Sequence, residues 1–291
     1  MKRRTLLKTL TGGLLLATTA GWIWRKPAAP LPAKKKAIEI IEHDPEPRIE
    51  HDPEPRLNYK VKHFNRDFVE DVYLPEAKWP LLQQTVRRME RLQKYIGYAN
   101  FSLLGFDEML RYARQFSVIG AFPPEEKSFL EEIFSNDAHN YGFFGDKVLT
   151  RLTAVIPHAE TIKIPRSGNF LFRGESLKMF QRVQKDVGQE LILTSGIRGV
   201  SKQLYLFLAK VEKTRGNLSR ASRSLAPPGH SYHGIGDFDV GQRGLGRDNF
   251  TARFAKSQAF NKLRELGYIN IRYTPDNQVG VRYEPWHIKV V

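Results

Sequence analysis

No cysteine occurs among the 291 residues of the chain. This absence excludes cysteine nucleophiles, cysteine-ligated zinc sites and disulfide frameworks. Two catalytic patterns are missing as well. There is no Ser-x-x-Lys, which one class of serine peptidases requires, and no His-Glu-x-x-His, which marks a common class of zinc peptidases. A hydrolytic site in this chain would therefore have to be assembled from other His, Asp and Glu residues.

Acidic residues are absent from residues 1–36, where nine Lys and Arg residues lie. The net charge of the chain is +15, so residues 37–291 retain +6. A moderately basic body suits an anionic partner such as cell-wall polymer or anionic lipid, and it equally suits a soluble basic surface. We predict no nucleic-acid partner.

The N-terminus has the layout of an export signal. A basic heptapeptide that starts at Lys2 and includes Arg3 and Arg4 precedes an uncharged stretch from Thr9 to Trp24. The adjacent arginines resemble a twin-arginine signal. The stretch is shorter than the about 20 apolar residues of a membrane span, and an uncleaved anchor is the alternative. We expect the body in the periplasm or cell envelope.

Four regions are predicted along the chain. Residues 1–26 are the export signal or N-terminal anchor. Residues 27–56 are a proline-rich linker, in which an octapeptide at 41–48 recurs unchanged at 49–56. Residues 57–160 form a helical region, and residues 161–291 form the domain that carries the chemistry.

Apolar residues recur at helical spacing in the region 57–160. Further helical runs are predicted at 106–116 and 124–134. The periodic positions of the longest run are Leu81, Leu82, Val86, Met89, Leu92 and Ile96.

The last region alternates helix and strand signals, which predicts an α+β fold: a small antiparallel sheet flanked by helices, carrying a zinc site and preceded by the helical appendage. A hairpin is expected across residues 275–277. The predicted helices are 175–187, 202–213 and 250–266, and the strands are 191–195, 237–240, 269–273, 279–283 and 287–291.

Three short segments of this region carry candidate chemistry. A hydrolytic zinc site needs three protein ligands, commonly His and carboxylate, and an open fourth position. The first segment has a basic fork at a strand end, the second has histidines and aspartates around a turn, and the third has a glutamate three residues before a histidine. They are Ser195-Gly-Ile-Arg198 with Gln203 downstream, Pro228-Gly-His-Ser-Tyr-His-Gly-Ile-Gly-Asp-Phe-Asp239, and Glu284-Pro-Trp-His287.

The residue types in these segments fit a metal-dependent hydrolase. His233 and an aspartate on the following strand can converge on one ion, and His287 from a neighbouring strand completes the set. Glu284 can then serve as a base, held by the rigid proline turn. Arg198 offers a positive fork to a carboxylate or a developing oxyanion. Each segment alone is more often structural, and the combination favours a metal site.

Together the segments resemble the D-alanyl-D-alanine carboxypeptidases related to VanY and VanX, over roughly residues 165–291. That family's pattern runs Ser-Gly-Tyr-Arg with a downstream Gln, then Ser-x-His-x-x-Gly-x-Ala-x-Asp, then Glu-Pro-Trp-His. The resemblance implies zinc held by His233, an aspartate and His287. It further implies Glu284 as general base, Arg198 in the substrate site, and hydrolysis at the D-alanine end of cell-wall peptides.

The middle segment departs from the family's spacing of seven residues between the histidine and aspartate ligands. From His233 to Asp239 the spacing is six. Asp239 is favoured because the flanking serine and glycine keep the family's register. The alternative pair is His230 and Asp237, which are seven apart. If Asp239 is the ligand, Asp237 faces the same side of the strand and can support a ligand from behind.

We therefore predict an exported, monomeric, zinc-dependent D,D-carboxypeptidase that acts on peptidoglycan stem peptides. The predicted substrate contacts are Gln203, Ser231 and Trp286. L,D-carboxypeptidase or murein endopeptidase activity on the same scaffold is an alternative, as is a degenerate peptidoglycan-binding protein. The presence of both Glu284 and His287 favours the enzyme.

Overall fold

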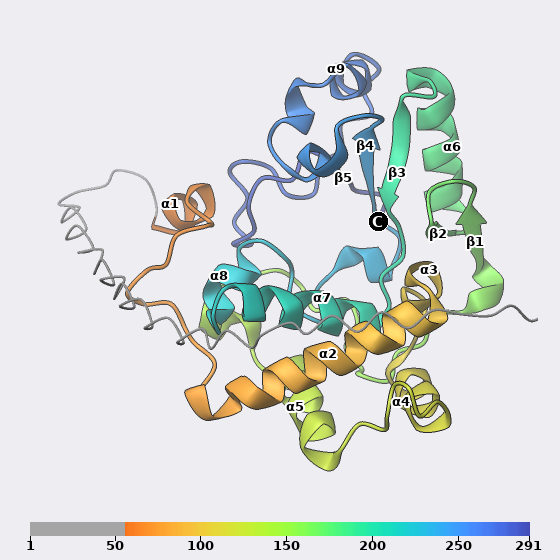
Figure 1. Ribbon diagram of the computed structural model, residues 1–291. Helices are drawn as coiled ribbons and strands as arrows, with labels where there is room; N and C mark the ends of the chain where they lie inside the picture. The colour runs from red at the N-terminus through yellow and green to blue at the C-terminus, as the bar shows by residue number, and fades with distance from the viewer. Residues whose placement is uncertain (1–55) are drawn as a thin grey trace, which may run out of the picture. The chain divides into compact units, whose positions relative to one another are not determined.

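A computed structural model describes residues 56–291 (Figure 1). The predicted signal or anchor and nearly all of the predicted linker lie outside the described residues. Within residues 56–291, no helix is both long and apolar enough to cross a membrane.

Helices and small antiparallel sheets make up the described chain, and the predicted α+β class is confirmed. The α-helices are α1 (Arg56–Lys62), α2 (Trp79–Ile96), α3 (Tyr98–Phe101), α4 (Phe106–Gln115), α5 (Pro124–Ser135), α6 (Glu175–Val187), α7 (Val200–Lys213), α8 (Leu218–Ser222) and α9 (Gln258–Glu265). The 3-10 helices are η1 (Glu76–Lys78), η2 (Ala138–Tyr141), η3 (His158–Glu160), η4 (Tyr232–Gly234), η5 (Gly246–Phe250) and η6 (Phe254–Lys256). The strands are β1 (Thr161–Ile164), β2 (Asn169–Phe172), β3 (Leu191–Ser195), β4 (Phe238–Gln242) and β5 (His287–Ile288).

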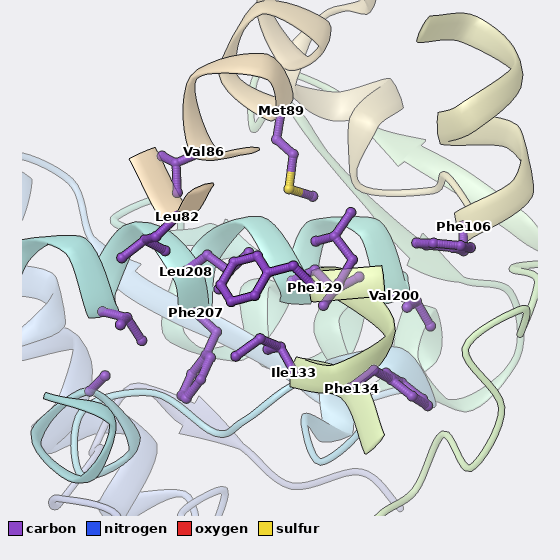
Figure 2. Close-up of a cluster of buried hydrophobic side chains, with 14 of the residues drawn as sticks. Leu82, Val86, Met89, Phe106, Phe129, Ile133, Phe134, Val200, Phe207 and Leu208 are labelled. Atoms are coloured by element: carbon purple, nitrogen blue, oxygen red, sulfur yellow. The ribbon is translucent and has the colours of Figure 1, made fainter. Parts of the chain in front are cut away.

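The helices α2, α4, α5 and α7 share one hydrophobic core (Figure 2). The periodic face of α2 is buried as predicted, with Leu82, Met89 and Leu92 fully enclosed. Each such side chain stabilises the fold by roughly 1.5–3 kcal/mol relative to an exposed one. Phe129 from α5 and Phe207 from α7 fill the space beneath them. Because α7 lies beyond residue 160, this core joins the helical region to the region that follows it.

A second core lies around the three-stranded sheet, whose strand order is β3-β4-β5 and whose neighbours are antiparallel. Helices α6 and α9 cover it, and α6 runs alongside β3 in Figure 1. Helix α6 and strand β3 have the predicted bounds. Strand β4 begins one residue later than predicted, and β5 is limited to His287–Ile288 instead of continuing to residue 291.

The register of this sheet positions the predicted site residues. Ser195 lies opposite Asp239, and Asp239 lies opposite His287, so three residues form one row across three strands. The pairing of β3 with β4 shifts between Leu193 and Ser195. Such an irregularity re-aims the side chains at the end of a strand, and here it occurs where the site begins.

The predicted helix at 250–266 is wrong in its first half, where the chain forms η5 and η6 before α9 begins. Hydroxyl side chains explain the difference. Thr251 Oγ1 donates to the carbonyl of Asp248 over 2.9 Å, and Ser257 Oγ accepts from the backbone N–H of Phe260 over 3.2 Å, capping α9. Side chains that bond to nearby backbone in this way compete with continuous helix.

The hairpin predicted across residues 275–277 does not form, because its two arms bond to other segments. The first arm lies against β5, where the N–H of Lys289 donates to the carbonyl of Asn270 over 2.8 Å. The second arm bonds to distant parts of the chain. The carbonyl of Val279 accepts a hydrogen bond from the N–H of Phe144, and the N–H of Arg282 donates to the carbonyl of Arg223, each over 2.9 Å. The local turn signal is therefore overridden by tertiary pairing. This C-terminal segment serves as a bridge between the sheet and the helical region.

Candidate active site

The centre of the candidate site is a cluster of His233, Asp239 and His287, one ligand atom of each lying within 4.8 Å of the others. His233 comes from η4, Asp239 from the middle strand β4, and His287 from the edge strand β5. The side chains are 2% exposed. His233 Nε2 lies 3.2 Å from Asp239 Oδ1, and His287 Nδ1 lies 3.4 Å from the same oxygen.

Hydrogen bonds behind the cluster fix the orientation of both imidazole rings. His233 Nδ1 is 2.8 Å from the carbonyl oxygen of Gly196, and His287 Nε2 is 3.0 Å from Asp237 Oδ2. Both partners are acceptors, so each of these ring nitrogens carries a proton. In the tautomer that binds a metal, His233 Nε2 and His287 Nδ1 are the lone pairs that face the carboxylate of Asp239.

The protonation states of this cluster suit metal ligation. Burial, reinforced by the positive charge of Arg198, lowers the pKa of His233 to about 4, so the ring is neutral at pH 7. Burial alone would raise the pKa of Asp239, but attraction to His233 and Arg198 outweighs it and holds that pKa below its usual range. A neutral imidazole and an ionised carboxylate are the forms that bind a metal.

Three buried acceptors that converge without a proton between them are unfavourable unless a cation lies among them. Around a tetrahedral zinc ion, N and O ligand atoms are about 3.3–3.5 Å apart. The observed separations of 3.2 and 3.4 Å fit that value. Support of each ligating histidine by a carbonyl or carboxylate is also the usual arrangement at such centres. The residues therefore fit a zinc ion.

The carboxylate of Glu284 lies beside the cluster, with Oε2 3.8 Å from His287 Nδ1. Its side chain is 12% exposed, and burial raises its pKa to about 7. The backbone turn is fixed at both ends, because Glu284 N–H donates to the carbonyl of Tyr273 and Glu284 carbonyl accepts from the N–H of His287. A carboxyl group with a pKa near 7 can both accept and deliver a proton at neutral pH.

Arg198 is held against the cluster by two hydrogen bonds. Its Nε donates to Ser195 Oγ over 2.9 Å, and its Nη2 donates to Asp239 Oδ2 over 2.6 Å. Asp239 thus presents one oxygen to the histidines and the other to the guanidinium. The pair also neutralises part of the buried charge, which reduces the cost of keeping Asp239 ionised.

The predicted substrate contacts occupy different places. The buried side chain of Gln203 links two loops by hydrogen bonds. Its Nε2 donates to the carbonyl of Arg198, and its Oε1 accepts from the N–H of Gly229. Ser231 is buried beside η4, directly before the turn that carries His233. Trp286 belongs to the core around the sheet.

The alternative ligand pair, His230 and Asp237, is not brought together as a cluster in the described part of the chain. His230 Nδ1 lies 3.0 Å from the carbonyl of Gly145, away from the three converging residues. Asp237 instead contacts the rear nitrogen of His287. The geometry therefore groups Asp239, not Asp237, with the two histidines.

Comparisons with known proteins find matches in the C-terminal part of the chain. Residues 173–291 match the profile of the family described as VanY, D-alanyl-D-alanine carboxypeptidase. Residues 173–291 belong to the VanY family. No curated protein matches the chain. All eight predicted site residues fall within this VanY-family segment.

Solved structures similar to the chain include the LdcB LD-carboxypeptidase, with 21% identity over 45% of this chain and a TM-score of 0.38. The chain spans 63% of the length of that protein. A VanY D,D-pentapeptidase mutant from a VanB-type resistance cassette, in complex with Zn(II), shows 24% identity over 45% of this chain and 78% of its own, with a TM-score of 0.37. VanYB in complex with D-alanine-D-alanine shows 24% identity over 45% of this chain and 77% of its own, with a TM-score of 0.38.

Sequence reasoning missed one residue of the VanY-family segment that borders the site. The guanidinium of Arg282 lies between the rings of Phe64 and Trp286, 4.9 Å from each centroid, and its Nε is 3.7 Å from Glu284 Oε1. Phe64 lies outside the VanY-family segment. The position of Arg282 two residues before Glu284 was the available signal, but its aromatic partners come from distant parts of the chain.

A second missed residue supports the rear of the site. Arg272 Nε donates to Asp237 Oδ2 over 2.5 Å, and its guanidinium lies 3.3 Å from the ring centroid of Tyr232. Burial would raise the pKa of Asp237, but hydrogen bonds from His287 and Arg272 lower it overall. Asp237 therefore stays ionised and able to accept from His287. No pattern in the sequence links Arg272 to this carboxylate.

Proposed function

We propose that the chain is a zinc-dependent D-alanyl-D-alanine carboxypeptidase that acts on peptidoglycan stem peptides in the cell envelope. The observation that carries this proposal is the buried cluster of His233, Asp239 and His287, with a near-neutral carboxyl group, Glu284, beside it. The match of residues 173–291 to the VanY family supports the substrate class.

His233 Nε2, Asp239 Oδ1 and His287 Nδ1 would hold the zinc ion. When bound, the ion supplies Lewis acidity, polarising the scissile carbonyl and making a water molecule more acidic. Gly196 and Asp237 accept hydrogen bonds from the nitrogens of the two rings that do not face the ion. Their role is to hold the ligands in one orientation before the substrate arrives.

Glu284 moves the proton in the proposed reaction. Hydrolysis adds one water across the amide bond between the last two D-alanines: the C–O bond forms, the C–N bond breaks, and one proton must reach the leaving nitrogen. Glu284 takes a proton from the attacking water and delivers it to that nitrogen, yielding a shortened peptide and free D-alanine. Its pKa of about 7 allows both transfers at neutral pH.

Arg198 is proposed to bind the negative charge of the substrate. Its Nε and Nη2 are held by Ser195 and Asp239, which orients the planar guanidinium beside the metal cluster. A charged donor in this place can hold the terminal carboxylate or the developing oxyanion. Ser231 and Trp286 are proposed to line the substrate site, and Gln203 is proposed to position Arg198 through its carbonyl.

The assay that tests this function incubates the full chain and zinc with pentapeptide-bearing muropeptides and identifies the products by mass. We expect loss of one D-alanine. Glu284→Gln preserves shape but removes the basic carboxylate, and the rate should fall by about 10²–10⁴ while zinc content and folding are unchanged. Glu190→Gln is the matched control, because Glu190 is exposed and its side chain is outside the site.

Other products would contradict parts of the proposal. Loss of a residue from tetrapeptides only would indicate an L,D-carboxypeptidase, and cleavage of cross-linked dimers would indicate an endopeptidase. If wild type and Glu284→Gln bind a D-Ala-D-Ala peptide equally and neither releases D-alanine, the protein is a degenerate binding protein.

The organisation around this activity is also proposed. Residues 1–26 direct export, through a twin-arginine signal or as an anchor, residues 27–56 tether the body, and residues 161–291 act as a monomeric catalytic unit. Residues 57–160 support it, since α2 and α5 share a core with α7.

A further inference from the structure

A pocket of about 550 Å³ lies between the helical region and the β1–β2 hairpin. None of the predicted site residues lines it. Small-molecule sites commonly have volumes of roughly 300–1,000 Å³. The wall is built from the end of α2, from α3 and α4, and from η3 and the hairpin, through residues that include Ile96, Asn100, Leu103, Tyr112, His158 and Phe170.

The lining combines apolar side chains with neutral polar ones and His158. No Lys, Arg, Asp or Glu lines the pocket, although the chain is strongly basic. Two charged side chains lie behind lining residues: Glu108 is 4.0 Å from His158, and Arg111, which pairs with Glu108 at 3.5 Å, has its guanidinium 5.6 Å from the ring centroid of Tyr112. A pocket without fixed cations does not select a phosphate or carboxylate ligand. Aromatic and aliphatic faces combined with amide and hydroxyl groups instead suit a neutral ligand with apolar faces and hydroxylated edges.

A row of aromatic rings leads out of the pocket. Tyr112 lies nearly parallel to Phe116, with an interplanar angle of 16° and centroids 6.1 Å apart, and Phe116 contacts Tyr95 at 4.7 Å. Tyr95 is 50% exposed. Rings with an apolar face and a polar edge are suited to ligands that are themselves amphipathic. A chain of sugar rings, with C–H faces and hydroxyl edges, matches this row in chemistry and in its repeating form.

The segment 196–199 connects a lining residue of the pocket, Phe170, to the candidate active site. On one side, Gly196 carbonyl accepts from His233, and Arg198 bonds to Asp239. On the other, Ile197 N–H donates to the carbonyl of pocket residue Phe170 over 2.9 Å. A Cβ on Gly196 would lie 2.0 Å from that carbonyl, so only glycine permits this close approach. The pocket residue Phe170 is thus linked to the cluster of His233, Asp239 and His287 through this one backbone segment.

We propose that this pocket binds the neutral glycan chain of peptidoglycan, while the stem peptide attached to that chain reaches the metal cluster past residues 196–199. The proposal rests on the proposed function for its choice of glycan. Through this pocket the protein recognises the glycan polymer as well as the end of the stem peptide.

Direct binding tests the pocket without any need for catalysis. The full chain is titrated with the β-1,4-linked tetrasaccharide of N-acetylglucosamine, a neutral probe, by calorimetry. We expect saturable binding that weakens by about tenfold in Tyr112→Ala and in Asn100→Ala. Asn100 is exposed, so its variant remains informative if Tyr112→Ala does not fold. Tyr73→Ala is the control, because Tyr73 is a half-exposed tyrosine outside the pocket and should leave binding unchanged.

Release of D-alanine provides the second readout. In Asn100→Ala, KM should rise on polymeric peptidoglycan and stay constant on the free stem pentapeptide. Absence of saturable tetrasaccharide binding by wild type, or equal binding by the pocket variants, overturns the proposal and leaves the metal-site function standing. Saturable, variant-sensitive binding without D-alanine release from any substrate supports the pocket and overturns the proposed function.

Discussion

Two buried aspartates of this protein are surrounded in opposite ways. Asp71 accepts hydrogen bonds from both Nη atoms of Arg223 at 2.7 and 2.8 Å, from Asn217 at 2.7 Å, and from the N–H of Phe68 at 3.1 Å. Every neighbour is a donor. Asp239 receives one such bond, from an arginine, while its other oxygen faces two histidine nitrogens whose protons are directed elsewhere.

The difference shows which buried charge belongs to a site. The Asp71 cluster is complete without a ligand, and it ties the segment before α2 to the chain around α8. The Asp239 cluster instead offers three ligand atoms whose arrangement fits a cation. Burial and a lowered pKa are common to both carboxylates, so neither property distinguishes them. What distinguishes the two carboxylates is whether all of their neighbouring groups donate hydrogen bonds to them.

The largest effect on activity should come from Asp239→Ala. Removing one of three ligands should abolish zinc retention and hydrolysis, whereas His230→Ala should keep both, since His230 bonds to a backbone carbonyl away from the cluster. Metal content by elemental analysis should be about one zinc per wild-type chain. His233→Ala and His287→Ala should behave as Asp239→Ala does. Stoichiometric zinc in any of these three variants would show that the cluster is structural, as at Asp71.

A smaller effect is expected for Asp237→Asn, which weakens the acceptor behind His287. Metal affinity and activity should fall by about 10–100-fold without complete loss, as for other residues that orient a ligand. Competition with a chelating dye measures the affinity. The control is Asp248→Asn, since Asp248 also pairs with an arginine but lies at the surface. Complete metal loss in Asp237→Asn would make Asp237 a ligand.

Asp71→Asn should have the smallest effect on catalysis and a large one on stability. It leaves the guanidinium of Arg223 buried without its counter-charge, which costs about 3–5 kcal/mol of unfolding free energy. Urea denaturation measures that loss, and zinc content of the folded protein should match wild type. If Asp71→Asn is as stable as wild type, Asp71 does not stabilise the position of the segment before α2.

The pH dependence of stability gives a further contrast. Burial raises the pKa of Asp71, but bonds from Arg223 and Asn217 outweigh it and lower the pKa overall. The stabilisation is therefore present above the unfolded-state pKa of about 3.9 and is lost as pH falls through the lower folded-state value. Denaturation between pH 7 and 2 should show a steeper acid loss in wild type than in Asp71→Asn. Parallel curves would contradict this linkage.

Sequence alone determined the features that are local. The hydrophobic period of three and four residues specified α2, and Gly188 ended α6 where predicted, because helix signals depend on neighbours within a few residues. The residue types in the three short segments, and their order, also predicted that His233, Asp239 and His287 form a cluster suited to a metal ion. The structure brings these three residues together.

Tertiary structure decided what depends on distant partners. The second arm of the hairpin predicted near residue 276 pairs instead with Phe144 and Arg223, far away in the chain. The Gly196 carbonyl and Asp237 orient the two imidazole rings through hydrogen bonds. Phe64 contacts Arg282 from the other end of the described chain. Such contacts gain their energy only after the backbone has been brought together, so no spacing along the sequence records them.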